Sequence, residues 1–175
     1  MTDYDFPWEY NFPPFFTIQP NADTRNAQLQ AWRSLVVGYC TSKKIYSMEV
    51  TEALNHPLFQ NKPLGRGLNE EGLHEVLADL QKHAHLEWTD KRKTKFLIHW
   101  KTVKQWSKIL YEHASSCGLT NSVCTFYELT KSDDVQDKEF FGLDESVLKK
   151  ALQLLQEEGK AVLINFEGSE GVKFL

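Results

Sequence analysis

The chain repeats itself at an offset of 75 residues, and this duplication constrains its fold more than any other feature. Residues 67–73 read Gly-Leu-Asn-Glu-Glu-Gly-Leu, and residues 142–148 read Gly-Leu-Asp-Glu-Ser-Val-Leu. The correspondence continues through three further identical pairs: Leu77 with Leu152, Leu80 with Leu155, and Gln81 with Gln156. Aligned leucines could arise by chance, but a shared Gly-Leu entry followed by a good helix N-cap is harder to obtain that way. We infer a tandem duplication with a boundary near residues 101–104.

Both copies show the same order of expected elements. The expected helices pair as follows: 24–42 with 103–116, 47–54 with 123–129, and the helix after Asn69 with the helix after Asp144. The third helix of each copy carries apolar residues at i, i+3, i+4 and i+7, which is the stripe of a packed amphipathic helix. A polar turn then separates two short apolar runs, 86–88 from 96–100 and 161–164 from 172–175, with residues 167–171 forming the second turn.

Three helices followed by a two-stranded wing are the elements of a winged helix. The sequence therefore predicts an α+β protein with two tandem winged-helix domains, each with three helices and a β-hairpin wing. We expect the first domain over residues 23–101 and the second over 102–175. An N-terminal arm, residues 1–22, precedes them.

The arm is rich in aromatic residues and proline. Aromatic side chains occupy every even position from Tyr4 to Phe12, and residues 13–16 read Pro-Pro-Phe-Phe. Proline disfavours a helix here, and a period of two puts the even side chains on one face of an extended backbone. The rings can dock on the chain's own body or on another subunit, and their density favours a binding anchor.

We therefore expect the arm to bind partners and to pack only partly on its own domain, so that replacing Phe15 and Phe16 would hardly change folded stability. The candidate binding residues of the arm are Trp8, Tyr10, Phe12, Pro13, Pro14, Phe15 and Phe16.

Composition limits the cellular setting and the class of ligand. The net charge of −4 provides no overall attraction to nucleic acid or anionic membranes. The start of the chain has acidic residues and no apolar core, and no run approaches the roughly 20 apolar residues of a membrane helix. Three cysteines without metal-like spacing suit a reducing compartment. We expect a soluble intracellular protein.

Winged helices often read DNA, so a nucleic-acid-binding or transcription-associated protein is the alternative interpretation. Such proteins bring Lys or Arg to the phosphates on the third helix. Here residues 69–82 and 144–158 are both net acidic. The basic turn at 91–93, with Lys95, is more typical of a solvated hairpin tip. The domains therefore look like protein-interaction modules, and no DNA partner is expected.

No catalytic pattern stands out. The sequence has neither a phosphate-binding loop nor a glycine-rich dinucleotide turn. His83 and His85 are too sparse a set for a metal site, and the acidic run 133–137 lacks the glycine and terminal glutamate of a calcium loop. We expect no enzyme activity, no cofactor and no metal.

The arm followed by two winged helices resembles the family of the smallest subunits of ESCRT-II, an endosomal sorting complex. The resemblance is carried by residues 8–16, Trp-Glu-Tyr-Asn-Phe-Pro-Pro-Phe-Phe, and covers the whole chain. Further matching segments are Pro57-Leu58-Phe59, Leu86-Glu87-Trp88, Tyr127-Glu128-Leu129-Thr130, Gly142-Leu143-Asp144 and Gly171-Val172-Lys173-Phe174. Phe16 stands where a ligand of WW domains generally has tyrosine, which weakens the rival interpretation as such a ligand.

This resemblance implies a role in sorting ubiquitinated membrane cargo into multivesicular bodies. It implies two copies of this chain per complex, with the arm docking on the two larger ESCRT-II subunits and the second domain recruiting an ESCRT-III subunit. The protein would be cytoplasmic and would reach the endosomal membrane only through the complex. Candidate ESCRT-III-binding residues, on or after the short second helix, are Val123, Phe126, Tyr127, Phe140 and Phe141.

Overall fold

A computed structural model describes residues 4–166 and 168–175. The first three residues of the predicted arm, and Glu167 in the predicted second turn, lie outside the described residues. The chain divides between Trp100 and Lys101 into two compact units, here called the first and second unit. This division falls one residue before the expected start of the second domain.

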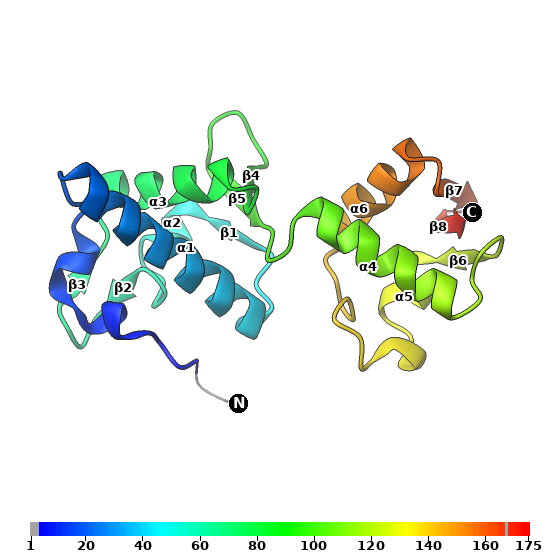
Figure 1. Cartoon of the computed structure of the whole chain (residues 1–175), viewed down its shortest axis with the longest axis horizontal. Helices are drawn as coiled ribbons and strands as arrows, with labels where there is room; N and C mark the ends of the chain where they lie inside the picture. Colours follow the sequence, from blue (N-terminus) through cyan, green and yellow to red (C-terminus); the bar gives the residue numbers. More distant parts are fainter. Residues whose placement is uncertain (1–3, 167) are drawn as a thin grey trace. The chain divides into compact units, whose positions relative to one another are not determined.

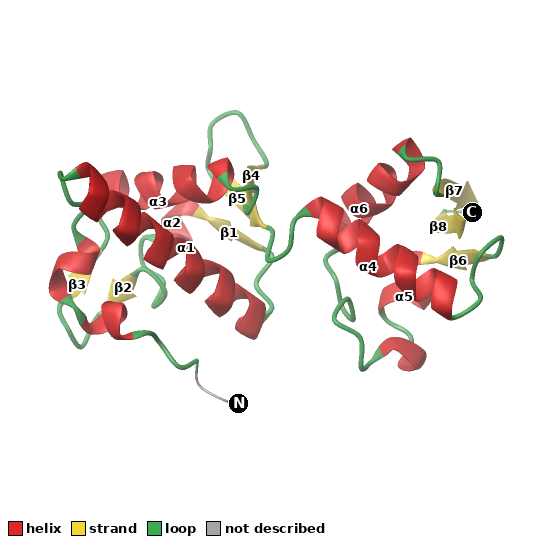
Figure 2. Ribbon diagram, viewed as in Figure 1, coloured by secondary structure: helices red, strands yellow, loops and turns green. Residues whose placement is uncertain are grey.

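The first unit contains α-helices and a small antiparallel sheet (Figures 1 and 2). The sheet has the strand order β1 (Ser47–Glu49), β5 (Lys95–Ile98), β4 (Leu86–Trp88). The wing strands β4 and β5 therefore pair with each other and, through β5, with β1 from the middle of the unit. A second small sheet pairs β2 (Gln60–Asn61) with β3 (Arg66–Gly67). The elements are α1 (Ala22–Lys43), β1 (Ser47–Glu49), α2 (Val50–Ala53), β2 (Gln60–Asn61), β3 (Arg66–Gly67), α3 (Glu70–Lys82), β4 (Leu86–Trp88) and β5 (Lys95–Ile98).

The second unit repeats this order without the β2–β3 pair. Its sheet has the order β6-β8-β7, and the wing strands β7 and β8 are the longest of the described strands. The elements are α4 (Val103–Ser116), β6 (Val123–Thr125), α5 (Phe126–Thr130), the 3-10 turn η3 (Asp133–Val135), α6 (Glu145–Glu157), β7 (Ala161–Phe166) and β8 (Ser169–Phe174). The predicted α+β fold with two winged-helix modules is confirmed.

The repeat has a clear structural basis in helix caps and core side chains. The Asn69 side chain accepts a hydrogen bond from the Gly72 backbone N–H at 2.7 Å, and the Asp144 side chain accepts one from Ser146 at 3.0 Å. Each cap satisfies a backbone donor that the helix itself leaves unpaired. Trp32 of α1 and Trp106 of α4 are both fully buried. A side-chain oxygen acceptor thus caps the third helix, and a tryptophan of the first helix fills the core, in both units.

One part of the predicted organisation is wrong. The segments expected as short helices over 47–54 and 123–129 each begin as a strand, and only α2 and α5 are helical. The strand residues Ser47 and Val123 pair with the wing, opposite Leu97 and Lys173. Each wing is therefore part of a three-stranded sheet. Three residues are too few for periodicity to separate a strand from a helix, so the pairing partner decided the outcome.

The arm is not a continuous extended segment. It forms two 3-10 turns, η1 (Trp8–Asn11) and η2 (Pro13–Phe16), and the backbone is extended at Pro7, Phe12 and Thr17 between and around them. Proline supports this arrangement, because its fixed φ suits the first residue of a helical turn and its missing N–H is not needed there. The even-numbered rings therefore do not share one face.

Candidate partner-binding surfaces

The arm packs along the first unit. In its first turn, the Tyr10 hydroxyl donates to the backbone oxygen of Pro57, and the Tyr10 and Phe6 rings stack with their centroids 3.9 Å apart. Burial raises the pKa of the Tyr10 hydroxyl, so the group remains a donor at neutral pH. Phe6 in turn contacts Tyr39 of α1. Tyr10, predicted to bind a partner, is therefore an internal anchor of the arm.

Phe15 and Phe16 belong to the core of the first unit. Both residues are 4% exposed. The Phe15 ring stacks on the Trp32 ring with a centroid distance of 4.2 Å and an interplanar angle of 5°. The Trp32 indole N–H donates to the Phe15 backbone oxygen at 3.0 Å. The expectation that these two rings pack only partly on their own domain is wrong. Trp32 contacts both rings and itself stacks on Phe59, and burying an aromatic ring against this cluster removes a large apolar area from water.

Trp8 and Phe12 are the arm's exposed aromatic residues. Their side chains are 70% and 48% exposed, and their rings lie 5.7 Å apart. They border an open, largely apolar groove of about 450 Å³ between the arm and α1, whose other wall includes Ala27 and Ala31. An exposed pair of large rings beside an apolar groove is the usual chemistry of an interface hot spot.

The remaining two arm candidates are backbone contributors. Pro13 and Pro14 are exposed and begin η2, and the Pro14 backbone oxygen accepts from the side-chain amides of Gln19 and Gln28. These prolines therefore begin the 3-10 turn that directs Phe15 and Phe16 into the core and leaves Phe12 exposed to solvent. Of the seven arm residues singled out in the sequence, the exposed ones that border this groove together are Trp8, Phe12 and Pro14.

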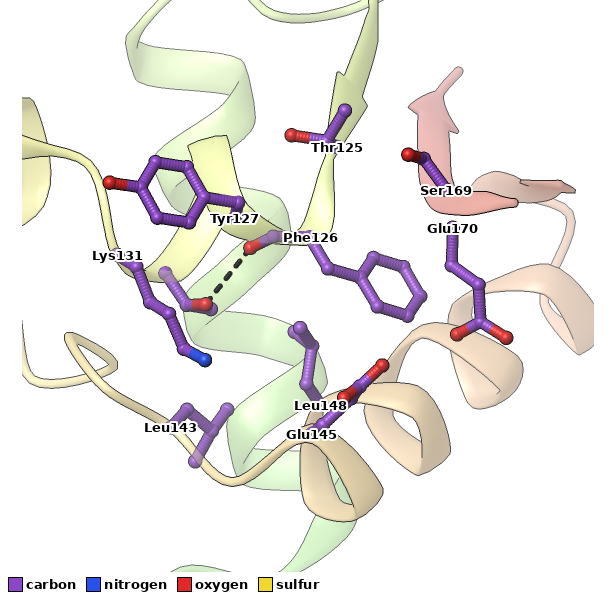
Figure 3. A pocket seen from close by; sticks show the side chains of 10 residues that line it. Thr125, Phe126, Tyr127, Lys131, Leu143, Glu145, Leu148, Ser169 and Glu170 are labelled. Atoms are coloured by element: carbon purple, nitrogen blue, oxygen red, sulfur yellow. Dashed lines mark hydrogen bonds between the residues drawn. The ribbon is translucent and has the colours of Figure 1, made fainter. Parts of the chain in front are cut away.

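The second unit has a pocket of its own beside α5 (Figure 3). Its volume is about 290 Å³, and Phe126, Leu143 and Leu148 form its apolar lining. Charged groups from the start of α6 and from β8, Glu145 and Glu170, stand at its border, and the Phe126 ring points toward them in Figure 3. An apolar floor with charged walls suits the side of an amphipathic helix.

The five residues predicted to contact an ESCRT-III subunit do not form one surface. Tyr127 on α5 is 65% exposed and lines the pocket with the buried Phe126. Val123 is 48% exposed but lies on β6, not on the short helix where it was expected. Phe140 is 2% exposed and packs against the His113 ring, whereas Phe141 is half-buried. Phe140 is therefore a core residue, because its loop folds back onto α4.

The cysteines behave as core or surface thiols. Burial raises the pKa of the Cys40 thiol to about 12 and that of Cys124 to about 11, so neither is a reactive thiolate at neutral pH. Within residues 4–166 and 168–175, no group of three or more His, Cys, Asp or Glu side chains is placed to hold a metal ion. In the same part of the chain, no helix has both the length and the apolar character to cross a membrane.

Two buried residues that hydrogen-bond to the arm have no signature in the sequence. Gln28 on α1 and Asn61 on β2 are buried amides whose side chains donate to backbone oxygens of the arm. A lone Gln or Asn among polar neighbours has no period or spacing that marks it as buried. Only the contacts between arm and body, which join residues distant in sequence, show that these amides are buried and hydrogen-bonded to the arm.

Comparison with known proteins gives consistent similarities along almost the whole chain. The family model for "ESCRT-II complex subunit" matches residues 9–144. Vacuolar protein-sorting-associated protein 25 of Xenopus laevis is 50% identical over 171 residues, covering 98% of both chains. The protein of the same name from Homo sapiens is also 50% identical, covering 98% of this chain and 97% of its own.

Solved structures agree with this similarity. The crystal structure of subunit VPS25 of the endosomal trafficking complex ESCRT-II matches with a TM-score of 0.86 at 28% identity, covering 97% of this chain and 98% of that one. A chain in the crystal structure of the endosomal complex ESCRT-II (VPS22/VPS25/VPS36) matches with a TM-score of 0.83 at 28% identity, with the same coverage.

Proposed function

This chain belongs to the family of ESCRT-II complex subunits, and from this membership we propose that it is a non-catalytic adaptor within such a complex. It acts in sorting ubiquitinated membrane cargo into multivesicular bodies. Its work is binding: the arm and first unit contact the larger subunits of the complex, and the second unit contacts an ESCRT-III subunit. It is cytoplasmic and reaches the endosomal membrane through the complex.

The larger subunits are the partners of the arm. The related complex of known structure contains VPS22 and VPS36 beside VPS25, and we extend this composition to the present chain, with two copies of it per complex. The observation that supports the arm as the contact is the exposed pair of Trp8 and Phe12 beside an apolar groove. Rings that are already ordered lose little conformational freedom when a partner covers them.

The test is reconstitution of the complex from the full-length chain and its two larger subunits. Native mass spectrometry should give two copies of this chain per complex. The double variant Trp8→Ala/Phe12→Ala should weaken assembly by roughly 100-fold or more, as expected for two aromatic hot-spot residues. Tyr127→Ala, an exposed aromatic residue of the second unit, is the control and should assemble normally. Normal assembly of the double variant would contradict the arm's proposed role.

The second unit recruits the ESCRT-III subunit through the pocket beside α5. The pocket places the exposed Tyr127 next to an apolar floor that includes Leu143 and Leu148. An amphipathic helix of the partner can lay its apolar side along this floor while its polar side stays in water.

Titration of the full-length chain with the N-terminal helix of the ESCRT-III subunit tests this assignment. Tyr127→Ala should weaken binding at least tenfold, whereas Val123→Ser, an exposed change on β6, should leave it within about twofold. Equal affinity of wild type and Tyr127→Ala, or a loss caused by Val123→Ser alone, would move the site away from the pocket.

A further inference from the structure

Gln28 is buried within the first unit and uses its side-chain amide to hold the arm. Its Nε2 group donates to the backbone oxygens of Phe15 at 3.0 Å and Thr17 at 2.8 Å, with a longer contact of 3.4 Å to Pro14. Its Oε1 atom accepts from the backbone N–H of Gln19 at 3.0 Å. A buried amide is costly unless its donors and acceptor are paired, and the arm supplies the partners for both ends.

Asn61 does the same at the other turn of the arm. It is 3% exposed, and its Nδ2 group donates to the backbone oxygen of Tyr10 at 2.8 Å. Its Oδ1 atom accepts from the backbone N–H of Leu64 at 3.2 Å. Gln28 therefore holds η2, and Asn61 holds η1.

Both amides hold main-chain atoms only. The path of the arm is therefore fixed without using the side chains of Trp8 and Phe12, which lie on or between the two held turns. These two rings remain outside and free for another molecule. Because Gln28 and Asn61 bind the main chain of the arm, they order the arm without occupying the side chains that would contact a partner.

We propose that Gln28 and Asn61 are positioning residues for partner binding, which hold the arm in its binding conformation before the larger ESCRT-II subunit arrives. This inference rests on the proposed function of the arm. Without either amide, the arm spends only part of its time in the competent conformation, and the apparent affinity falls by that fraction. The loss appears in the association rate, because the contacts in the final complex are unchanged.

Two isosteric changes test the proposal in the full-length chain. Gln28→Glu keeps the acceptor for Gln19 and removes the donors, and Asn61→Asp keeps the acceptor for Leu64 and removes the donor. Gln30→Glu and Asn26→Asp are the matched controls, since they make the same chemical and charge changes at exposed positions of α1. Gln28→Met provides an uncharged second variant at the first site.

Association and dissociation rates with the larger subunits are measured for each variant, together with backbone amide exchange. We expect an association rate about tenfold lower for Gln28→Glu and Asn61→Asp, with a dissociation rate within twofold of wild type. Amides of the arm, such as Thr17 and Phe12, should exchange faster, while those of Leu77 and Leu80 in α3 should keep their protection. The two controls should match wild type throughout.

Three results would overturn the proposal. One is a wild-type association rate in variants whose arm amides exchange fast, because arm order would then be irrelevant to binding. Another is slower association in the controls, which would point to charge. If Gln28→Glu exchanges fast throughout α3, it has unfolded, and a wild-type association rate in Gln28→Met then decides against the proposal. Failure of the wild-type chain to bind contradicts the proposed function itself.

Discussion

Phe15 and Trp8 lie seven residues apart in the same arm, yet one ring is 4% exposed and the other is 70% exposed. Both are large aromatic residues next to proline, so neither hydrophobicity nor local pattern distinguishes them. The difference comes from what each ring meets on the body. Phe15 stacks on Trp32, whereas Trp8 lies against the Phe12 ring and remains largely exposed. At the scale of single residues, then, the arm contains two kinds of aromatic residue: anchors and contacts.

Replacing Phe15 or Phe16 by alanine should destabilise the first unit. Each change leaves a cavity in a packed core, which typically costs about 3–5 kcal/mol. Trp8→Ala and Phe12→Ala remove exposed rings and should change the free energy of unfolding by no more than about 0.5 kcal/mol. Chemical denaturation of the four variants measures the difference. Similar stabilities for all four would mean that Phe15 and Phe16 are not core residues.

His56 should make the first unit sensitive to acid. Burial lowers the pKa of its imidazole below 6.5, against the weaker opposing effect of Glu52, and its Nδ1 atom accepts from the Leu58 backbone N–H at 3.1 Å. The unfolded chain therefore takes up a proton at higher pH than the folded chain does. The stabilising contribution is complete above about pH 6.5 and is lost as pH falls toward the folded-state pKa.

His56→Asn offers an oxygen acceptor that does not titrate in this range, so its melting temperature should fall less between pH 7.5 and 5.5 than that of wild type. An identical pH response of His56→Asn and wild type would rule out this histidine as the origin.

At the scale of elements, short-range information was reliable for helices and poor for short strands. The third helices begin directly after Asn69 and Asp144, as predicted, because a cap and an amphipathic stripe are both local features. β1 and β6 were missed because three-residue strands exist only through pairing with β5 and β8. The wing supplies the hydrogen bonds that decide between strand and helix.

Removing either cap should test the equivalence of the two third helices. Asn69→Ala and Asp144→Ala each leave a backbone N–H of the first turn without its side-chain acceptor, which costs about 1 kcal/mol. Asn26→Ala, at an exposed position within α1, is the control and should have little effect or stabilise slightly. Denaturation midpoints report the changes. A cost confined to one of the two caps would show that the repeated motif has lost its role in one copy.

At the scale of the whole molecule, each unit has a complete core. Trp106, Leu110 and Leu152 are buried within the second unit, and a three-stranded sheet closes it. The duplication therefore reproduced an entire folding module and not half of one. The two modules differ at the surfaces that we propose as partner-binding sites: the first carries the arm, and the second has the pocket beside α5.

Residues 101–175 alone should fold. We expect helical and sheet circular dichroism and a single cooperative unfolding transition, because the core of this unit is built from its own residues. A fragment ending at residue 142 lacks α6 and the wing, and it should remain unfolded. A disordered spectrum for residues 101–175 would show that its stability depends on the first unit.

The sequence by itself determined the features that recur at short range. The duplication, the caps and stripes of the helices, the wings and the presence of an aromatic arm were all readable, because each depends on neighbours within a few residues or on a repeat. The resemblance to a known family added the expected partners, and the match to ESCRT-II complex subunits confirmed that family.

Tertiary structure decided which side chains of the arm and of the body are buried and which remain exposed. It placed Phe15 and Phe16 in the core, left Trp8 and Phe12 outside, and paired the buried amides of Gln28 and Asn61 with the arm. These outcomes depend on contacts between the arm and residues distant from it in sequence. Burial is a property of the surface that a side chain meets, so a ring or an amide acquires it only when the chain has folded.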